Sequence, residues 1–428
     1  MNTGRQDLST WALHFIHDYN ADNEPTDETM LFEIYGGYPY NEDKELNDRF
    51  DSWRISDEHY PIDPDPDALQ VLLKIITDGH IRSTWAFRGN RPTIYGPRAA
   101  VCFTEMPLYA LLEYAERRGN ESVRNYAVGV PKHELFAAGG RPVMYGLSGK
   151  HAEQAQRSPF NKGWPRKLAP SCGIAESEQY RYVAMSSDPS RPIDWSHERE
   201  WRWVDHEDKC SCPGLPIWLS EEPFSFSQAF VVVPDSSAVM RVLDRLKELY
   251  DAGANEFDYP FSRTVLEATS VVALDRLETD VSAERKRELR LEEIPTSSIE
   301  RFVRPKASEG LVAKVRSVLA EAKTAADEAA AARAESAPRA VGGDHVGDVA
   351  GWAWLVVHDA QSPLVSALLQ LGEANSHPGI GYCIRDIGGL GWRGDQALSL
   401  AEAGVGAARA VFEKHFPNIS FGIKTRWD

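Results

Sequence analysis

The sequence predicts an α+β fold, with a mixed core followed by a separate small C-terminal α+β domain. Short apolar segments typical of strands interchange with amphipathic helical segments over the first 280 residues. Near residue 340 a stretch rich in Pro, Ser and Gly forms a flexible joint, and residues 349–428 carry apolar segments of their own. A chain of 428 residues has room for two or three modules.

Composition excludes several classes of protein. Hydrophobic residues make up 42% and charged residues 26% of the chain, as in globular proteins, and no apolar run approaches the roughly 20 residues needed to span a bilayer. The polar N-terminus lacks the features of a secretory signal, so we expect a cytoplasmic protein with no membrane partner. A net charge of -17 argues against a wholly basic nucleic-acid-binding surface, although a local basic groove stays open.

The first part of the chain is predicted to contain strands, one helix and a long insertion. Residues 8–18 have the pattern of a first strand. Residues 21–66 are acidic and rich in Pro, which predicts an insertion with little regular structure. An amphipathic helix is predicted over 68–79, with Asp67 as its N-cap and Gly79 at its C-terminal end. Further elements expected here are strands at 81–86 and 99–103 and a helix at 108–116.

The rest of the chain continues this mixture. Apolar patterns predict strands at 126–130, 182–185, 199–204, 229–233 and 270–274 and a helix at 236–250. Alanine-rich helical segments follow at 283–291 and 310–333. The C-terminal domain is expected to contain strands at 352–357, 381–387 and 419–423 and helices at 364–371 and 397–415. We therefore predict a core domain over 1–280, a helical segment and linker over 281–340, and an accessory domain over 349–428.

The cysteines do not indicate a disulfide framework or a metal centre. Their number, 5, is odd, and only Cys210 and Cys212 lie close together. With His197 and His206 upstream these thiols form a possible ligand set, but the spacing matches no common zinc pattern and a single short loop would supply every ligand. We expect no metal site.

Two glutamates near residue 200 are the strongest candidates for chemistry. Glu198 and Glu200 are two positions apart, so on a strand they would point to the same side, where mutual repulsion raises the pKa of one carboxyl group. Such a pair suits general acid/base work, and a carboxylate beside a sugar stabilises developing positive charge. The alternative is an exposed strand face with solvated ion pairs among Glu198, Arg199, Glu200 and Arg202.

A basic and aromatic stretch lies between the helix at 68–79 and the strand at 99–103. Its mixture of guanidinium groups and rings suits phosphates and stacked bases or nicotinamide, whereas the alternative is a solvated loop. The residues concerned are Arg82, Trp85, Phe87, Arg88, Arg91, Tyr95 and Arg98.

Several short segments together resemble the ADP-ribosyltransferase superfamily, in particular abortive-infection-type bacterial proteins and DarT-like DNA-modifying toxins. The segments are Leu13-His14-Phe15, Thr93-Ile94-Tyr95-Gly96-Pro97, Val101-Cys102-Phe103-Thr104-Glu105-Met106-Pro107 and Asp194-Trp195-Ser196-His197-Glu198-Arg199-Glu200-Trp201-Arg202. The resemblance covers about residues 8–20 and 68–205. It implies an ADP-ribosyltransferase-like core that uses NAD as its substrate.

The resemblance also implies roles for individual residues. Glu200, with Glu198, would be catalytic, and His14 would bind the ribose or the nicotinamide side of NAD. Tyr95 would stack on nicotinamide, with Phe103 or Trp85 as substitutes, whereas core packing is the alternative for each. The full set of NAD-binding residues that it implies is His14, Phe15, Arg82, Arg88, Tyr95, Phe103, Thr104 and Glu105.

The function implied is an NAD-dependent ADP-ribosyltransferase acting as a toxin or phage-defence effector. Its acceptor would be a nucleic acid or a protein, and residues 349–428 would bind a regulatory partner or the target. Three alternatives stay open: an NAD hydrolase that uses water as the acceptor, a nuclease that cuts RNA with Glu, His and Arg groups, and a non-catalytic sensor on the same fold.

Overall fold

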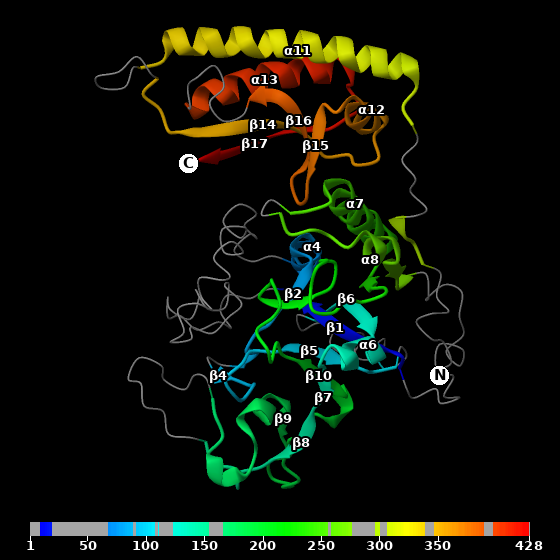
Figure 1. Ribbon diagram of the computed structural model, residues 1–428, viewed down its shortest axis with the longest axis vertical. Helices are drawn as coiled ribbons and strands as arrows, with labels where there is room; N and C mark the ends of the chain where they lie inside the picture. The colour runs from blue at the N-terminus through cyan, green and yellow to red at the C-terminus, as the bar shows by residue number, and fades with distance from the viewer. Residues whose placement is uncertain are drawn as a thin grey trace. The chain divides into compact units, whose positions relative to one another are not determined.

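The chain forms two compact units. The computed structural model describes residues 9–18, 67–88, 91–107, 110, 123–153, 166–255, 258–275, 296–299, 306–338, 346–388 and 397–427. The first unit comprises Met1–Leu243 and Phe257–Ile299, and the second comprises Asp244–Glu256 and Glu300–Asp428. Both units contain helices and strands, in agreement with the predicted α+β class (Figure 1).

A seven-stranded sheet is the centre of the first unit. Its order is β13-β12-β6-β1-β5-β10-β7, with β1 between β6 and β5. The pairs are antiparallel except for β12 with β13, which are parallel. The strands are β1 (Trp11–His17), β5 (Val101–Thr104), β6 (Val123–Pro131), β7 (Arg141–Pro142), β10 (Glu200–Trp203), β12 (Phe230–Val233) and β13 (Ser270–Ala273).

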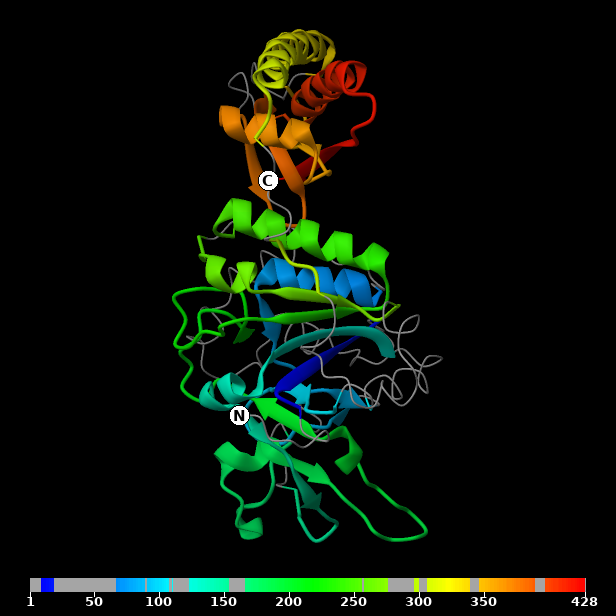
Figure 2. The ribbon, with the colours of Figure 1, turned by 90° about the vertical axis from the view of Figure 1, so that its right-hand side faces the viewer.

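Helix α4 (Ala68–Asp78) packs against β1 and β6 and confirms the caps predicted from the sequence (Figure 2). The Asp67 side chain accepts a hydrogen bond from the N–H of Gln70, and the Gln70 side chain accepts one from the N–H of Asp67. Gly79 ends the helix at φ 78°, in the left-handed region that favours glycine. An added Cβ at Gly79 would lie 2.7 Å from Leu219, so the position is restricted in space as well.

The other elements of the first unit are short, apart from α7, and most were not predicted. The predicted strand at 81–86 is confined to three residues, because the backbone beyond it makes only an isolated bridge at Thr84. The elements are β2 (His80–Arg82), β3 (Phe87–Arg88), β4 (Arg91–Pro92), α6 (Lys132–Ala137), β8 (Met144–Leu147), η2 (Pro170–Cys172), η3 (Glu176–Arg181), β9 (Tyr182–Ala184), η4 (Ser196–Glu198), β11 (Gly214–Pro216), α7 (Ser236–Ala252) and α8 (Arg263–Glu267). Helix α7 is divided between the units, because its residues from Asp244 onward belong to the second.

The second unit is built on a four-stranded antiparallel sheet of order β15-β16-β14-β17. After the long helix α11, the elements follow one another as strand, helix, strand, strand, helix, strand, which is the split β-α-β arrangement. Helices α11 and α13 lie on one side of this sheet (Figures 1 and 2). The elements are α11 (Glu309–Ser336), β14 (Gly351–Val357), α12 (Pro363–Leu371), β15 (Ala374–His377), β16 (Gly381–Gly388), α13 (Leu398–His415) and β17 (Phe421–Trp427).

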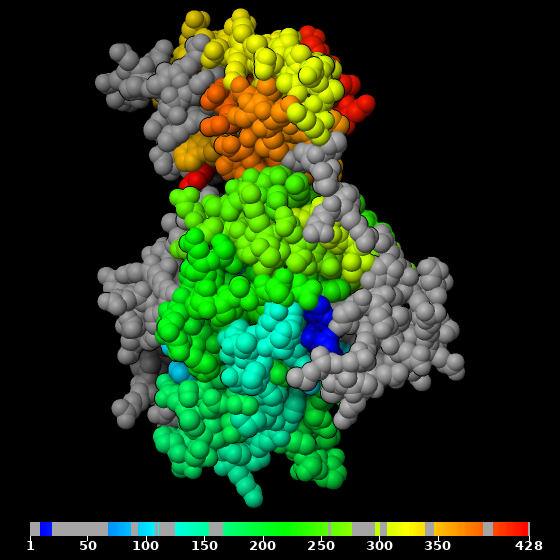
Figure 3. Space-filling view, turned by 45° about the vertical axis from the view of Figure 1, so that its right-hand side comes forward, coloured from blue at the N-terminus to red at the C-terminus, as the bar shows by residue number. Residues whose placement is uncertain are grey.

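Helix α11 belongs to the second unit, whereas the sequence predicted it as part of a separate segment over 281–340. Val315, Val318 and Leu319 share one buried cluster with Leu355 of β14 and Phe412 of α13. Figure 3 shows α11 (yellow) at the surface of this unit beside α12 (orange). The Pro, Ser and Gly stretch near 340 therefore connects two elements of one core.

Three predictions lie outside the described residues: the insertion at 21–66, the helix at 283–291 and, apart from residue 110, the helix at 108–116. In the part of the chain that the structure describes, no helix is long and apolar enough to cross a membrane.

Candidate functional site

Glu200 is the first residue of strand β10, and a tight turn directly before it sets its direction. The turn η4 contains Glu198, and Arg199 then adopts φ 44°, in the left-handed region. The side chain of Asp194 accepts a hydrogen bond from the N–H of Ser196 at 2.9 Å and so stabilises the start of this turn. The predicted side-by-side arrangement of Glu198 and Glu200 on one strand face is therefore wrong, because Glu198 precedes the strand.

The carboxylate of Glu200 is held by Arg202. Nε of Arg202 lies 2.7 Å from Oε1 of Glu200, and Nη2 lies 3.2 Å from Oε2. The two side chains are only 13% and 5% exposed, respectively. The remaining contacts orient the pair: Nη1 of Arg202 donates to the carbonyl oxygen of Tyr180 at 2.6 Å, and the N–H of Glu200 donates to the hydroxyl of Tyr145 at 2.8 Å. The alternative of a solvated ion pair does not fit this degree of burial.

Cys102 and Thr104 share the sheet face of this ion pair, because β5 and β10 place Thr104 opposite Glu200 and Cys102 opposite Arg202. Burial, together with the negative charge of Glu200, raises the pKa of the Cys102 thiol well above its usual value. Burial by itself would lower the pKa of the Arg202 guanidinium, but Glu200 and Cys102 together raise it above its usual value. The cluster thus contains the Glu200–Arg202 ion pair beside a neutral thiol.

Thr104 organises the turn that precedes Glu200. Its hydroxyl donates to the carbonyl oxygen of Glu198 and accepts from the N–H of Met106 at 3.1 Å. These contacts give the hydroxyl a structural role at the end of β5, next to Glu200.

His14 lies on the opposite face of the sheet. Leu13 pairs with Thr104, so Leu13 shares the face of Glu200, and the next residue points the other way. Nδ1 of His14 carries a hydrogen and donates a hydrogen bond to the carbonyl oxygen of Cys102 at 2.8 Å. The imidazole ring also meets the ring of Phe103 edge-on, at 5.9 Å between centroids. Burial lowers the pKa of His14 to about 4. The imidazole is therefore neutral at pH 7.

Tyr95 is buried, with a well-defined set of partners. The guanidinium of Arg166 lies over its ring at 4.1 Å and also donates to its hydroxyl, which in turn donates to Glu153 at 3.4 Å. The ring is 7% exposed and packs with Leu147 and Leu168. Because Arg166 covers one face of the ring, the position favours a structural anchor over a nicotinamide platform.

The other predicted NAD-binding residues are spread over the first unit. Nη2 of Arg82 lies 3.5 Å from the carboxylate of Asp78, and Glu105 pairs with Lys132 at 2.8 Å. Phe15 packs against the apolar cluster that contains Trp11 and Leu13. Trp85 is buried in a second cluster with Ile94 and Tyr180. The side chain of Arg88 lies outside the described residues.

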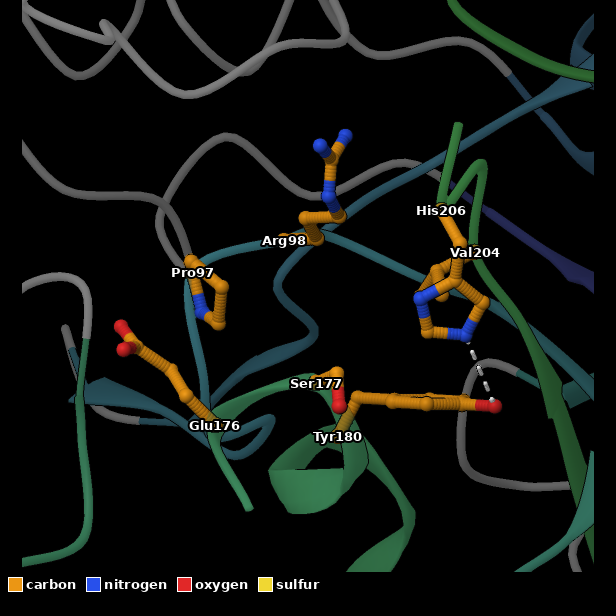
Figure 4. Close-up of a pocket in the computed structure, with 7 residues that line it drawn as sticks. All are labelled: Pro97, Arg98, Glu176, Ser177, Tyr180, Val204 and His206. Carbon is orange, nitrogen blue, oxygen red and sulfur yellow. Dashed lines mark hydrogen bonds between the residues drawn. The ribbon is translucent and has the colours of Figure 1, made fainter. Parts of the chain in front are cut away.

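The first unit contains a pocket of about 230 Å³ (Figure 4). Tyr180 joins this pocket to the Glu200–Arg202 pair, because its ring lines the pocket while its carbonyl oxygen binds Arg202. Nε2 of His206 lies 3.4 Å from the hydroxyl of Tyr180. The lining residues are Pro97, Arg98, Glu176, Ser177, Tyr180, Val204 and His206.

Two lining groups are neutral at pH 7. Burial raises the pKa of Tyr180 to about 12 and lowers the pKa of His206. Arg98 brings a positive charge, and its guanidinium is fixed by the carboxylate of Asp208 and the carbonyl oxygen of Asp205. The pocket therefore offers an aromatic ring, an imidazole and the carboxylate of Glu176, next to the ion pair of Arg98 with Asp208. Sequence analysis named Arg98 in the basic stretch and His206 only as a possible metal ligand, and it did not identify Tyr180, because these residues are separated along the chain and meet only through the fold.

Cys210 and Cys212 are both buried, at 1% exposure. Burial raises the pKa of the Cys212 thiol well above its usual value. Among the described residues no group of three or more His, Cys, Asp and Glu side chains is arranged to hold a metal ion.

Comparisons with known proteins find no relative of this chain: no protein-family profile, curated protein or solved structure matches it.

Proposed function

We propose that the chain is an enzyme that cleaves NAD at the nicotinamide glycosidic bond and transfers ADP-ribose, with Glu200 as its catalytic carboxylate. The observation that carries the proposal is the half-buried Glu200, held by Arg202 at the start of β10 and joined through Tyr180 to the pocket. The resemblance of the segments around His14, Thr104 and Glu200 to ADP-ribosyltransferases points to the same residue.

The chemistry needs a fixed negative charge. When the bond between ribose and nicotinamide breaks, nicotinamide leaves with the bonding electron pair and the ribose develops positive charge, which a nearby carboxylate stabilises. Arg202 donates one hydrogen bond to each carboxylate oxygen of Glu200. Each oxygen has a further lone pair that can accept a hydrogen bond from a ribose hydroxyl. The acceptor then attacks the ribose carbon and loses its proton.

The pocket suits one part of the substrate. Its volume of about 230 Å³ is below the roughly 300–1,000 Å³ of pockets that enclose a whole drug-sized ligand. We therefore assign it to the nicotinamide side of NAD, with the ring of Tyr180 in the stacking role that the sequence assigned to Tyr95.

The biological role that we propose, a toxin or phage-defence effector acting on a nucleic-acid or protein acceptor, rests on the resemblance alone. An NAD hydrolase, in which water is the acceptor, uses the same site and the same first step.

The test measures nicotinamide release from NAD by the full chain and by Glu200→Gln, with and without cell lysate as a source of acceptors. The glutamine keeps the shape and can still accept from Arg202 but lacks the charge, so we expect release to fall by about 100-fold or more. Stimulation by lysate would identify a transferase, and release without stimulation a hydrolase.

The matched control is Glu373→Gln, which removes the carboxylate from an ion pair with Lys323 in the second unit. This variant should release nicotinamide at the wild-type rate. Equal rates for wild type and Glu200→Gln would refute the role of Glu200. Folded wild-type protein that releases no nicotinamide but cuts RNA would favour the nuclease, and absence of both activities would favour the sensor.

A further inference from the structure

The sheet of the second unit has one face that its helices do not cover. Ala353, Leu355 and Val357 of β14 point into the buried cluster shared with α11, α12 and α13. Because side chains alternate along a strand, Trp352 and Trp354 point to the opposite face. Both tryptophans are half-buried, and their rings meet edge-on at 5.6 Å.

The neighbouring strand adds positive charge to this face. Register places Arg426 opposite Trp352 and Lys424 opposite Trp354, so all four side chains share one side of the sheet. The guanidinium of Arg426 lies over the ring of Trp352 at 4.9 Å. Strands β14 and β17 contain no acidic residue, although the chain as a whole has a net charge of -17.

The other end of this sheet meets helix α7. The Asp244–Ala252 part of α7 belongs to this unit, and its Glu248 accepts the N–H of Gly379 at 3.1 Å. The carbonyl oxygen of Glu248 also accepts from the hydroxyl of Ser376 at 2.9 Å, and Cys383 of β16 is buried near it. We define the Trp352 surface as four partly exposed residues: Trp352, Trp354, Lys424 and Arg426.

We propose that the Trp352 surface binds single-stranded nucleic acid. Aromatic rings on a sheet stack unpaired bases without regard to sequence, and adjacent cations hold the phosphates that connect those bases. Two rings on the central strand β14 and two cations on the edge strand β17 provide these parts in register. An acidic peptide would use the cations but would leave the two tryptophans without flat partners. The charge and the rings together therefore favour a polynucleotide.

The experiment measures binding of a fluorescein-labelled oligouridylate of about 12 nucleotides to the full chain by fluorescence anisotropy over a range of salt concentrations. Trp352→Ala should weaken binding about tenfold, whereas Trp352→Phe, which keeps a stacking ring, should stay within about threefold of wild type. Arg426→Gln should lower the slope of log K against log salt by about 0.7, the value for one phosphate contact on a single strand. Arg409→Gln removes an equal charge from α13 and should leave the slope unchanged.

Several results would overturn the proposal: equal affinity of wild type and Trp352→Ala, equally tight binding of a duplex of the same length, or full competition by polyglutamate, which would indicate an acidic protein partner. If Trp352→Ala does not fold, Trp352→Phe and Arg426→Gln still test the proposal, because an unchanged salt slope for Arg426→Gln would contradict binding through phosphates.

A deoxyuridylate of the same length distinguishes RNA from DNA as the source of the strand, and tight binding of either supports the proposal. The assay contains no NAD, and Glu200→Gln should bind as wild type does, so failure of the proposed enzyme activity leaves this result intact.

Discussion

The sheets of the two units place their polar side chains in opposite ways. In the first unit, Arg202 and Cys102 lie within the sheet, and Arg202 is only 5% exposed at its side chain. In the second unit the inner face is apolar, with Ala353, Leu355 and Val357 at 0% exposure, and Lys424 and Arg426 lie on the outer face. A buried ion pair is often no more stabilising than apolar residues of the same volume. The first sheet therefore keeps charge at a position where stability does not require it, which is consistent with the role that we propose for Glu200.

The largest effect that we expect concerns the apolar core of the second unit. Phe412 is 0% exposed and lies against Phe421 at 5.5 Å between ring centroids. Phe412→Ala removes these contacts and leaves a cavity, so the free energy of unfolding of this unit should fall by about 4 kcal/mol. Urea denaturation measures the loss, and hydrogen exchange assigns it to a unit. Faster exchange in β1 or β10 instead of α13 and β14 would contradict the independence of the two cores.

The next effect concerns the buried charge of the first unit. Arg202→Met leaves Glu200 half-buried without its cation, and the free energy of unfolding should fall by about 3 kcal/mol. The double variant with Glu200→Gln should recover part of this loss, because no unpaired charge then remains.

Lys323→Met provides the matched control in the second unit. Lys323 and Glu373 are 33% and 32% exposed, so water screens their attraction and the change should cost less than about 1 kcal/mol. Similar losses for Arg202→Met and Lys323→Met would remove the contrast between the two sheets.

A smaller effect depends on pH. Burial lowers the pKa of His14 from 6.5 to about 4, and the same cause lowers the pKa of His80 to about 4. At pH 7 neither histidine binds a proton in the folded or the unfolded state. Between pH 6.5 and 4 the unfolded state binds protons and the folded state does not, so stability falls as pH falls. His80 is fully buried and His14 is partly exposed, and each should account for about 2–3 kcal/mol over this range.

Denaturation midpoints at several pH values between these limits measure this effect. His14→Gln keeps a donor for the carbonyl oxygen of Cys102 and does not titrate, so about half of the pH dependence should disappear. A slope equal to that of wild type would show that His14 is already protonated in the folded state.

Helix ends, strands and helices that depend on residues close together in the chain could be predicted from the sequence alone. The ends of α4 follow from Asp67 and Gly79, because a cap bonds to backbone groups of the adjacent turn. Strands β1 and β10 and the alanine-rich helix α11 follow in the same way from local apolar spacing and helix propensity. Glu200 could be singled out at this level because its spacing from Trp201 and Arg202 lies within one short segment.

Contacts between residues that are far apart in the chain follow only from the tertiary structure. A left-handed residue at Arg199 separates Glu198 from the strand, and the pairing of β5 with β10 brings Cys102 to Arg202. Tyr180 contacts Arg202, and helix α11 packs with β14 and α13, also through segments that are distant along the chain. The physical reason is that a cap or a periodic pattern is complete within a few residues, whereas burial and register depend on segments that the chain brings together only when it folds.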